Sequence, residues 1–457
     1  MSSPIKTIHP LPYFEDSAQL FAPLSGQPWA VFLDSGFPSV QQGRFDIIAA
    51  EPICTLMTHG QVTAIERDGE TVFSDEDPFE LVKQALTLDW PTLPDIPFNG
   101  GAIGYFAYDL ARRLEKLPQI STDEEHLAEM AVGIYLWAVV VDHEKKQSQL
   151  IGYLTEKQRE ELVARFSQFP ETCPEKQFEV TGPVAFNMDQ ADYEQAFNRI
   201  KHYLKEGDCY QVNLSQRFCA PCQGEPWMAY LKLRELNAAP FSCFMKTPEA
   251  TVLSSSPERF LKVHERWVET KPIKGTRPRR AIFHEDQEQA ALLENSDKDR
   301  AENVMIVDLL RNDISKTCKK GSVKVPKLFA VESYATVHHL VSTVTGELAE
   351  GRHALDLLKS CFPGGSITGA PKIRAMEVIE ELEPNRRGIY CGAIGYIGFD
   401  GNMDTNIVIR TLIESAGTIR FWAGGGIVND SEMTDEYQEC FDKASALLDV
   451  LQQMQPA

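Results

Sequence analysis

Three successive runs near the C-terminus decide the fold: Ile389-Tyr-Cys-Gly-Ala-Ile-Gly-Tyr-Ile-Gly-Phe399, Asn406-Ile-Val-Ile-Arg-Thr-Leu-Ile413 and Thr418-Ile-Arg-Phe-Trp-Ala-Gly-Gly-Gly-Ile-Val428. β-Branched and aromatic residues are frequent in these runs and glycines bound them, which is typical of β-strands. No regular helix separates the runs, so the strands follow one another directly. Strands connected in this way favour antiparallel pairing. The sequence therefore predicts an α/β or α+β chain with considerable antiparallel sheet.

Helices and further strands are predicted on the N-terminal and C-terminal sides of these runs. Apolar residues recur at helical spacing in the segments 192–205, 301–310, 371–382 and 435–454. Strand-like runs occur at 29–33, 131–141 and 149–154. The polar segment 170–183 is punctuated by prolines and is the candidate boundary between an N-terminal lobe, residues 1–180, and a second region, residues 185–455.

The overall composition excludes several classes of protein. The chain has 457 residues and a formal net charge of −21, so it lacks the broad basic surface that nucleic acids require. No apolar segment is long enough to span a membrane, and Glu15 and Asp16 interrupt the N-terminus where a signal peptide would be apolar. The ten cysteines are scattered, as expected for reduced thiols. We expect a cytoplasmic protein that binds neither nucleic acid nor membrane.

A basic stretch stands out in this acidic chain. Lys271-Pro-Ile-Lys-Gly-Thr-Arg-Pro-Arg-Arg280 carries five cationic side chains, which predicts an anion-binding site. Its central lysine, Lys274, lies between Pro272 and Gly275. Positive neighbours such as Lys271 and Arg277 would disfavour the ammonium form of Lys274, and a neutral amine is a nucleophile. The alternative interpretation is a solvated basic turn.

Two pairs of carboxylates indicate a possible metal site. Asp299 and Glu302 are three residues apart on one predicted helix, and Glu436 and Glu439 are three apart on another, so each pair shares a helix face. Oxygen ligands of this kind suit Mg²⁺. The alternative is two ordinary solvated helix faces, on which Lys298 and Lys443 would be surface ion-pair partners.

Glycine-rich segments and single polar residues are further candidates. The segment Phe362-Pro-Gly-Gly-Ser-Ile-Thr-Gly-Ala-Pro-Lys372 fails the Walker pattern but can still present N–H groups and hydroxyls to an anion. Ala423-Gly-Gly-Gly-Ile-Val428 either brings backbone close to a ligand or forms a flexible turn. Glu258, at the end of an apolar strand, is a candidate general acid or base, or else a partner of Arg259. Of His338-His339, strand alternation sends only one ring inward.

Taken together, these stretches resemble one family, the chorismate-utilising enzymes. The resemblance covers about residues 190–450 and is carried by Pro272-Ile-Lys-Gly-Thr276, Lys298-Asp-Arg-Ala-Glu-Asn303, Ile306-Val-Asp-Leu-Leu-Arg-Asn-Asp313, His339-Leu-Val-Ser342, the segment 364–372 and Ala423–Val428. The family includes anthranilate, isochorismate, salicylate and aminodeoxychorismate synthases. In the N-terminal part, Leu33-Asp-Ser35 and Arg44-Phe-Asp46 are similar to the aminating members.

Two positions indicate a branch of the family. Anthranilate and isochorismate synthases carry alanine where this chain has Lys274. Gln211 occupies the position at which isochorismate-type enzymes carry a lysine that activates water. The resemblance therefore implies amination of chorismate at C4 to 4-amino-4-deoxychorismate, for 4-aminobenzoate and folate synthesis. Lys274 argues against anthranilate synthesis, and the intact set of Lys274, Glu258, Glu302 and Glu439 argues against a non-catalytic metabolite-binding subunit.

The resemblance also implies a fold and a role for each candidate residue. We expect one large two-lobed α/β body of stacked antiparallel sheets with outer helices, in which residues 1–180 are intertwined with the rest. Lys274 would be the nucleophile, Glu258 the proton donor, and Glu302 and Glu439 would bind Mg²⁺, with contributions from Asp299 and Glu436. The substrate would contact Gln211, Thr276, His339, Ser366, Thr368, Lys372, Arg410, Gly424, Gly425 and Gly426. No glutaminase signature is visible, so ammonia would come from a separate glutamine amidotransferase subunit, forming a heterodimer.

A second pocket, for tryptophan, is implied by the feedback-regulated anthranilate relatives. The similar pieces in this chain are Ser35, Gln42, Gly43, Arg44, Phe45, Pro240, Phe241 and Ser242. Arg44 would meet a carboxylate, and Phe45 and Phe241 would line an indole slot. The alternative is a packed junction between the N-terminal and C-terminal halves of the chain.

Overall fold

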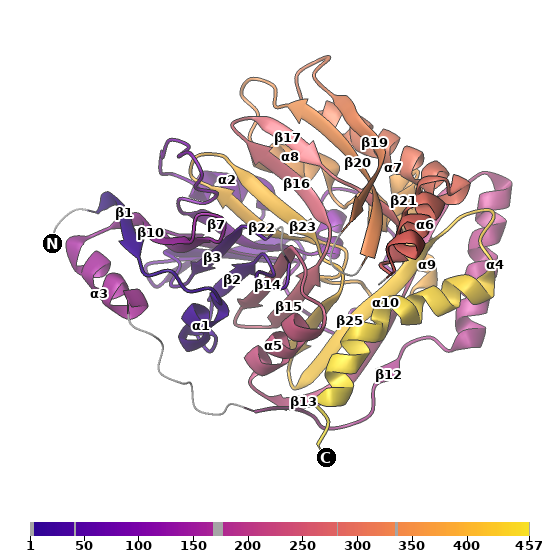
Figure 1. Cartoon of the computed structure of the whole chain (residues 1–457), viewed down its shortest axis with the longest axis horizontal. Coiled ribbons are helices and arrows are strands. Elements are labelled where there is room, and N and C mark those ends of the chain that lie inside the picture. The colour runs from indigo at the N-terminus through magenta and orange to yellow at the C-terminus, as the bar shows by residue number, and fades with distance from the viewer. Residues whose placement is uncertain (1–3, 41–42, 168–176, 281, 334–336, 457) are drawn as a thin grey trace.

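Two large antiparallel sheets with outer helices make up the molecule, which confirms the predicted fold class (Figure 1). The computed structural model describes residues 4–40, 43–167, 177–280, 282–333 and 337–456. Residues 170–176 of the predicted boundary segment lie outside the described residues. Within the described residues, no helix is long and apolar enough to cross a membrane, and the nine cysteines are free thiols.

The first sheet combines strands from the beginning, middle and end of the chain. Its order is β1 (Ile5–Leu11), β10 (Gln147–Leu154), β9 (Trp137–Asp142), β3 (Phe45–Ala49), β2 (Val31–Asp34), β14 (Phe241–Lys246), β15 (Thr251–Ser256), β24 (Thr411–Ser415), β25 (Thr418–Ile427), β13 (Gln211–Gly224) and β11 (Phe178–Val180). Two short strands, β12 (Ala185–Phe186) and β21 (Gly369–Ala370), also pair with β13.

The second sheet mixes the two halves of the chain in the same way. Its order is β18 (Ile273–Pro278), β20 (Val337–Glu347), β17 (Trp267–Thr270), β16 (Arg259–His264), β23 (Met403–Ile407), β22 (Ala393–Gly398), β7 (Gly101–Phe106), β8 (Met130–Tyr135), β4 (Cys54–His59), β5 (Val62–Arg67) and β6 (Glu70–Ser74), and β19 (Lys324–Ser333) pairs with β20. Figure 1 shows β22, late in the chain, beside β7 from the N-terminal part. Each sheet therefore depends on both halves of the chain.

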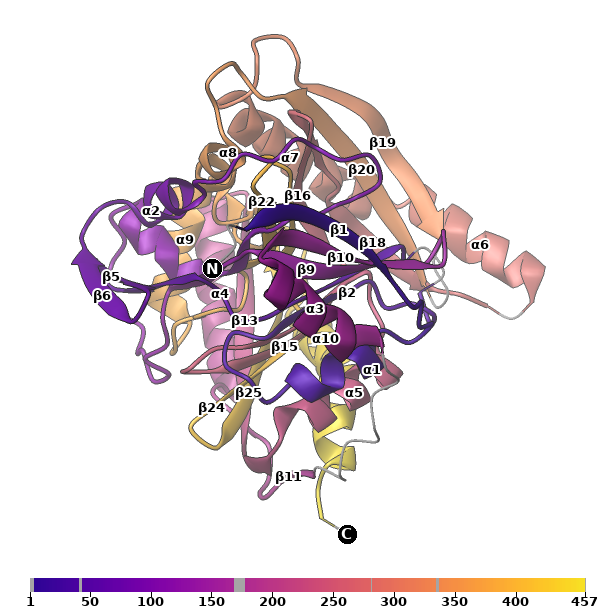
Figure 2. The same cartoon turned by 90° about the vertical axis from the view of Figure 1, so that its left-hand side faces the viewer.

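Helices cover the outer faces of the sheets. They are α1 (Ala18–Phe21), α2 (Pro78–Ala85), α3 (Glu156–Ser167), α4 (Gln190–Glu206), α5 (Pro226–Leu236), α6 (Phe283–Glu294), α7 (Asp297–Ser315), α8 (Ala354–Cys361), α9 (Lys372–Leu382) and α10 (Met433–Gln453), with short 3₁₀ turns η1 (Ala22–Leu24), η2 (Tyr108–Arg113) and η3 (Gly365–Ile367). Figures 1 and 2 both place α7 and α8 at the opposite end of the molecule from α1 and α5. The four predicted helices correspond to α4, α7, α9 and α10.

Apolar side chains from both sheets form the central core. Val31 and Ile47 of the first sheet belong to the same buried cluster as Leu56 and Ile103 of the second. A second cluster joins the other face of the first sheet to α1, α5 and α10, and a third lies beneath α4, α9 and α10. Burial of these apolar side chains stabilises the packing of the two sheets against each other and of the helices against the sheets.

Two predicted strands are each two strands in different sheets. The run 131–141 divides into β8 of the second sheet and β9 of the first, and the run 406–413 divides into β23 and β24. In the second case the break coincides with Arg410, whose φ of +50° lies in the left-handed region. Both runs are apolar because both faces of their strands are buried. An apolar run of this kind carries no sign of where the chain passes from one sheet to the other.

Candidate active site

Lys274 lies inside a strand rather than in a turn. It belongs to β18, which pairs with β20, and the pairing shifts register between Lys274 and Thr276. Gly275 occupies this bulge with a φ of +73°, and a Cβ atom there would come within 2.8 Å of Asp299 Cγ. The Lys274 Nζ donates a hydrogen bond to the carbonyl of Ser366 at 3.1 Å. The alternative of a solvated basic turn is therefore wrong for Lys274.

The amine of Lys274 is partly buried. Desolvation lowers the pKa of Lys274 below its ordinary value of 10.5, although the carboxylates of Glu302 and Glu258 act in the opposite direction. The charges of Lys271 and Arg277, predicted to cause this shift, are directed elsewhere. Lys271 pairs with a glutamate of β19 at 3.3 Å, and Arg277 is exposed to solvent.

Glu258 faces the same space as Lys274. Burial raises the pKa of Glu258 above its ordinary value of 4.5, and its Oε1 accepts a hydrogen bond from Ser366 Oγ at 3.0 Å. The neighbouring Arg259 pairs with Asp404 at 2.9 Å and with Glu269 at 3.0 Å. The alternative pairing of Glu258 with Arg259 is therefore wrong. A buried carboxyl of raised pKa can hold a proton for transfer at neutral pH.

The turn that carries Ser366 is held in place by its own side chains and by a buried ion pair. Thr368 Oγ1 donates a hydrogen bond to the carbonyl of Gly364 at 2.8 Å. Lys372 Nζ lies 2.6 Å from Asp313 Oδ2 and 2.8 Å from a backbone carbonyl at the end of α8. Both side chains therefore fix the turn, and the substrate contacts predicted for Thr368 and Lys372 stay predictions.

The four predicted metal-binding carboxylates lie on α7 and α10, two helices that the ion pair of Lys298 with Glu436 connects. Gly425 of β25 lies against α10, where a Cβ atom would be 3.0 Å from Glu436 Oε2 and 3.6 Å from Glu439 Oε1. On α7, burial raises the pKa of Glu302, and repulsion from Asp299 and Glu436 adds to this shift. The side chains of α7 and α10 thus share one electrostatic environment beside β25.

Two lysines pair with these carboxylates, as the surface alternative predicted. Lys298 Nζ lies 3.6 Å from Glu436 Oε1, and Lys443 Nζ lies 2.6 Å from Glu439 Oε1 and 3.0 Å from the carbonyl of Gly424. Burial acts to raise the pKa of Glu439, but Lys443 brings it below its ordinary value. Glu436 is itself only 2% exposed, so this is not an ordinary solvated helix face.

The donor set is compatible with Mg²⁺. In the described part of the chain, no three histidine, cysteine or acidic side chains form a ready-made metal cage. Mg²⁺ does not require one, because it commonly takes one or two protein carboxylates and completes its shell with water and substrate oxygens. Glu302 and Glu439 supply carboxylates of this kind from two helices. Oxygen-only donors are also the ligands that this ion prefers.

The predicted glycine turn is part of a strand. The segment 424–426 lies in β25 and pairs with β13, so the flexible-turn alternative is wrong. The glycines are needed for close packing, because a Cβ atom on Gly426 would come within 2.2 Å of Gln211 Nε2. The other amide atom, Gln211 Oε1, is buried and has no hydrogen-bond partner among the described residues. It can accept a hydrogen bond from a ligand.

Thr276, His339 and Arg410 are three further predicted substrate-binding residues that lie near one another. His339 Nδ1 lies 2.9 Å from Thr276 Oγ1, and burial, with Arg410 nearby, lowers the pKa of His339 to about 4. The prediction that only one of the two histidines is buried is wrong. His338 is also buried, because α6 covers that face of β20, and it bonds to Asp286 at 3.0 Å. Among the described residues Arg410 has no ion-pair partner, and its pKa is lowered by burial alone.

Comparison with known proteins assigns this arrangement to a family. A model of the chorismate binding enzyme family matches residues 33–449. The chain belongs to this family. It is 50% identical to aminodeoxychorismate synthase component 1 of Klebsiella aerogenes, covering 97% of this chain and 98% of that protein. It is 48% identical to the protein of the same name from Escherichia coli (strain K12), covering 98% and 100%.

Solved structures share the fold of this chorismate binding enzyme. Anthranilate synthase component I from Streptococcus pneumoniae TIGR4 is 33% identical and superposes with a TM-score of 0.79, covering 88% of this chain and 92% of that one. MenF, the menaquinone-specific isochorismate synthase from Escherichia coli, is 18% identical with a TM-score of 0.72, covering 99% and 96%. The resemblance seen in the sequence and the anthranilate synthase component I-like fold are both confirmed.

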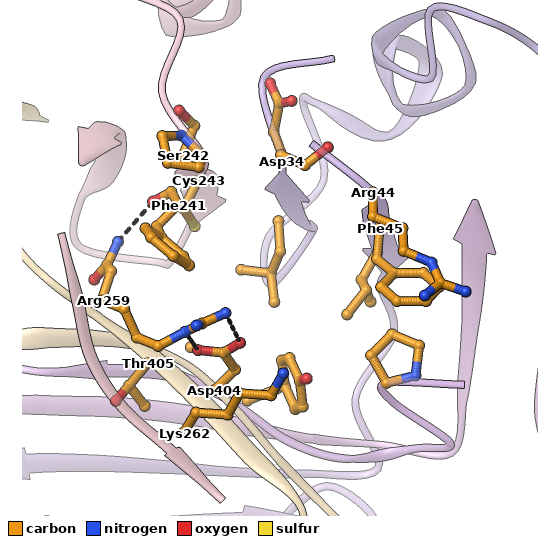
Figure 3. A pocket seen from close by; sticks show the side chains of 18 of the residues that line it. Asp34, Arg44, Phe45, Phe241, Ser242, Cys243, Arg259, Lys262, Asp404 and Thr405 are labelled. Atoms are coloured by element: carbon orange, nitrogen blue, oxygen red, sulfur yellow. Dashed lines mark hydrogen bonds and ion pairs between the residues drawn. The ribbon is translucent and has the colours of Figure 1, made fainter. Parts of the chain in front are cut away.

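This chorismate binding enzyme also has a cavity of about 460 Å³ where the second pocket was predicted (Figure 3). Seven of the predicted residues line it: Ser35, Gly43, Arg44, Phe45, Pro240, Phe241 and Ser242. The eighth, Gln42, lies outside the described residues. Figure 3 shows Phe241 and Arg259 on one wall and Arg44 and Phe45 on the other. The alternative of a closely packed junction is therefore wrong.

The charges that line the cavity differ from the prediction in one respect. Arg44 was expected to receive a carboxylate, but it already pairs with three acidic side chains, among them Asp142 at 3.1 Å. Its guanidinium lies 4.5 Å from the ring centre of Phe45. Lys262 also lines the cavity and has no ion-pair partner among the described residues. Lys262 is therefore the better anion receptor.

Sequence reasoning missed two residues that support the site. Asn213 Oδ1 accepts a hydrogen bond from Gln211 Nε2 at 3.2 Å. Arg387 is 1% exposed and donates to the carbonyl of Ile367 in the turn that carries Ser366, at 2.8 Å. The available signal was a pair of arginines, Arg386-Arg387, shortly before the apolar run 389–399, where a buried cation is unusual.

Proposed function

We propose that the chain aminates chorismate at C4, forming 4-amino-4-deoxychorismate through a covalent intermediate on Lys274. One observation carries this proposal. The partly buried amine of Lys274 and the buried carboxyl of Glu258 are joined through Ser366, which bonds to both. A nucleophile of lowered pKa beside a carboxyl of raised pKa is the pair that such a substitution needs. The two enterobacterial relatives named above support the same reaction.

The reaction divides into two substitutions. The neutral amine of Lys274 attacks C2, the ring double bonds shift, and the C4–O bond breaks as Glu258 gives its proton to the departing hydroxyl, which leaves as water. Ammonia then attacks C4, the double bonds shift back, and the C2–N bond to Lys274 breaks. The protons released by the two nitrogens return to Glu258 and Lys274. Because Lys274 occupies C2 in the intermediate, ammonia is directed to C4.

The substrate's two carboxylates need cationic or metal partners. Arg410, without an ion-pair partner among the described residues, is the receptor for one of them. Glu302 and Glu439 would hold Mg²⁺ for the other, with Asp299 and Glu436 close by. A bound Mg²⁺ would neutralise the ring carboxylate and polarise the conjugated system. Lys298 and Lys443 orient the two glutamates of α10 by ion pairs.

Ammonia is expected to come from a glutamine amidotransferase subunit, the second component implied by relatives named component 1. Gln211 Oε1, which has no hydrogen-bond partner in the described part of the chain, would accept a hydrogen bond from ammonia. Anthranilate synthesis is the alternative, since anthranilate synthase component 1 of Pseudomonas putida is 36% identical, over 95% of this chain and 92% of that protein. Lys274 argues against it, because that reaction needs no lysine at this position. The cytoplasmic location stays a prediction.

Product identity tests the proposed function. The purified chain is incubated with chorismate, Mg²⁺ and ammonium, and the products are separated by chromatography. The expected product is 4-amino-4-deoxychorismate. Formation of anthranilate or isochorismate, or no consumption of chorismate, would contradict the proposal.

The metal assignment makes a prediction of its own. Glu302→Gln removes one charge with little change of shape, so the Mg²⁺ concentration for half-maximal activity should rise about 10- to 100-fold. Calorimetry of Mg²⁺ binding in the presence of chorismate should show the same loss of affinity. Asp308→Asn, on the exposed face of the same helix, is the matched control and should change neither quantity. Equal Mg²⁺ affinity in the wild type and Glu302→Gln would exclude Glu302 as a ligand.

We further propose that the second cavity binds tryptophan. Phe45 and Phe241 offer aromatic faces on opposite walls, and each is stacked by an arginine, at 4.5 Å and 4.9 Å. The ammonium of Lys262 is a receptor for the carboxylate of the ligand. We expect the ligand to stabilise the junction between the halves of the chain and to leave turnover unchanged, because none of the described residues that line the cavity belongs to the candidate active site.

Calorimetry with tryptophan tests this second proposal. Phe241→Ala and Lys262→Ala should each weaken binding about tenfold, which corresponds to about 1.4 kcal/mol. Lys246→Ala, at the end of β14 and outside the cavity lining, is the control. The proposal is contradicted if the wild-type protein binds no tryptophan. It is also contradicted if Phe241→Ala and Lys262→Ala bind tryptophan as tightly as the wild type.

A further inference from the structure

The positions of the nucleophile and the proton donor depend on one short turn. Ser366 accepts the hydrogen bond of Lys274 with its carbonyl and donates its hydroxyl to Glu258. Any movement of the η3 turn would therefore alter the relation between Lys274 and Glu258. Residues that bond to this turn without belonging to the Lys274 and Glu258 pair could therefore determine how the two side chains are placed relative to each other.

Arg387 lies directly behind the turn and is buried, with 1% exposure. Its Nη1 donates to the carbonyl of Ile367 at 2.8 Å, one residue after Ser366. Its Nη2 donates to the carbonyl of Asn213 in β13 at 3.2 Å. Asn213 also holds the side chain of Gln211, the acceptor proposed for ammonia. One guanidinium thus connects the turn under Lys274 and Glu258 to the strand that carries Gln211.

Glu383 at the end of α9 fixes the orientation of this guanidinium. Its Oε1 lies 2.6 Å from Arg387 Nη2, and its Oε2 lies 2.9 Å from Arg387 Nε. Glu383 Oε1 also accepts a hydrogen bond from the backbone N–H of Ser215 in β13, at 2.9 Å. The rings of Tyr108 and Tyr390 lie 4.9 Å and 5.9 Å from the guanidinium carbon. The planar guanidinium of Arg387 is therefore held in one orientation by its ion pair, its hydrogen bonds and the two tyrosine rings.

A buried ion pair is a poor way to gain stability. Apolar side chains of similar volume often stabilise a core as well or better, because charges lose their hydration when they are buried. The contribution of the Arg387 guanidinium is geometric. Its N–H groups donate at the same time to backbone carbonyls of two different elements, the η3 turn and β13. Lysine, with a single point charge on a flexible stem, cannot reproduce this arrangement.

We propose that Arg387, oriented by Glu383, is a positioning residue that sets the Ser366 turn against β13 and so sets the geometry of Lys274 and Glu258. This inference rests on the proposed function of that pair. Among the described residues, Arg387 bonds to neither Lys274 nor Glu258. Its effect passes through the carbonyls of Ile367 and Asn213.

The test compares Arg387→Lys and Glu383→Gln with a matched control. Arg112→Lys is the control, because Arg112 is a partly buried arginine that pairs with α9 through Glu380, yet among the described residues it bonds neither to the Ser366 turn nor to β13. Arg387→Lys should lower kcat about 100-fold, the cost of misplacing reacting groups by about 1 Å, and leave the KM for chorismate within about threefold of the wild type. Arg112→Lys should lower Tm about as much as Arg387→Lys does, but it should leave kcat unchanged.

A pH profile separates positioning from general destabilisation. Burial lowers the pKa of Lys274, so a displaced turn that admits water should move the Lys274-dependent limb of the profile to higher pH in Arg387→Lys but not in Arg112→Lys. If Arg387→Lys fails to fold, Glu383→Gln carries the comparison. The inference is overturned if the folded variants keep the kcat and pH profile of the wild type, or lose kcat no more than Arg112→Lys. A wild-type protein that makes another product overturns the proposed function instead.

Discussion

Lys274→Ala is expected to lower 4-amino-4-deoxychorismate formation with ammonium by about 10⁴-fold or more, the range seen when a catalytic nucleophile is removed. The reason is that C2 is then left unoccupied, and no other amine among the described residues is bonded to the Ser366 turn. The fold should be kept, because alanine is smaller than lysine and the substitution removes the Lys274 hydrogen bond to the Ser366 carbonyl but not the backbone pairing of β18. Steady-state kinetics with product separation would measure the loss.

The neighbouring lysine provides the control for that experiment. Lys271 lies three residues away and pairs with Glu332 at 3.3 Å, outside the hydrogen bonds of the Ser366 turn. Lys271→Ala should therefore keep wild-type turnover within about twofold. Calorimetry should also show that Lys274→Ala still binds chorismate, because Arg410 and the carboxylates of α7 and α10 are intact. If Lys274→Ala formed the product at the wild-type rate, Lys274 would not be the nucleophile.

Glu258→Gln is expected to lower kcat by 10²- to 10⁴-fold, the usual contribution of a general acid. Glutamine keeps the shape of the side chain and can still accept the Ser366 hydrogen bond, so folding should be preserved. The wild-type rate should follow a bell-shaped pH profile, because Lys274 must be neutral while Glu258 must be protonated. Without the carboxyl, the fall at high pH should disappear and the rate should only rise with pH.

The choice of control follows from the pairing of nearby carboxylates. Glu269, on the adjacent strand β17, pairs with Arg259, so Glu269→Gln removes a charge near the site without removing a hydrogen bond to Ser366. It should leave the pH profile bell-shaped. A Glu258→Gln enzyme that retains both limbs of the profile would show that another group supplies the proton.

The sequence singled out candidate residues for the chemistry but not their surroundings. Lys274 could be identified because a basic stretch in an acidic chain and a resemblance at the same position agree. That it lies in a strand could not be predicted, because β18 exists only through pairing with β20, about 65 residues further on. The cause of its lowered pKa was missed for the same reason, since burial is a property of the folded chain.

The support of the site was the part least visible in the sequence. Arg387 and Asn213 are 174 residues apart, and nothing in either segment predicts their contact. The division of the run 131–141 into two sheets was hidden because strands buried on both faces lose the alternation that marks a sheet face. By contrast, the helices at 192–205 and 435–454 were predictable, because each has a clear apolar face at helical spacing.

The most direct test of the central claim is the mass of the enzyme during turnover. The protein is mixed with chorismate and Mg²⁺ without ammonium, quenched in acid, digested and analysed by mass spectrometry. We predict that the peptide containing Lys274 gains the mass of chorismate minus water, and that adding ammonium removes this adduct as 4-amino-4-deoxychorismate appears. An enzyme that forms this product while Lys274 carries no added mass at any time would contradict the covalent mechanism.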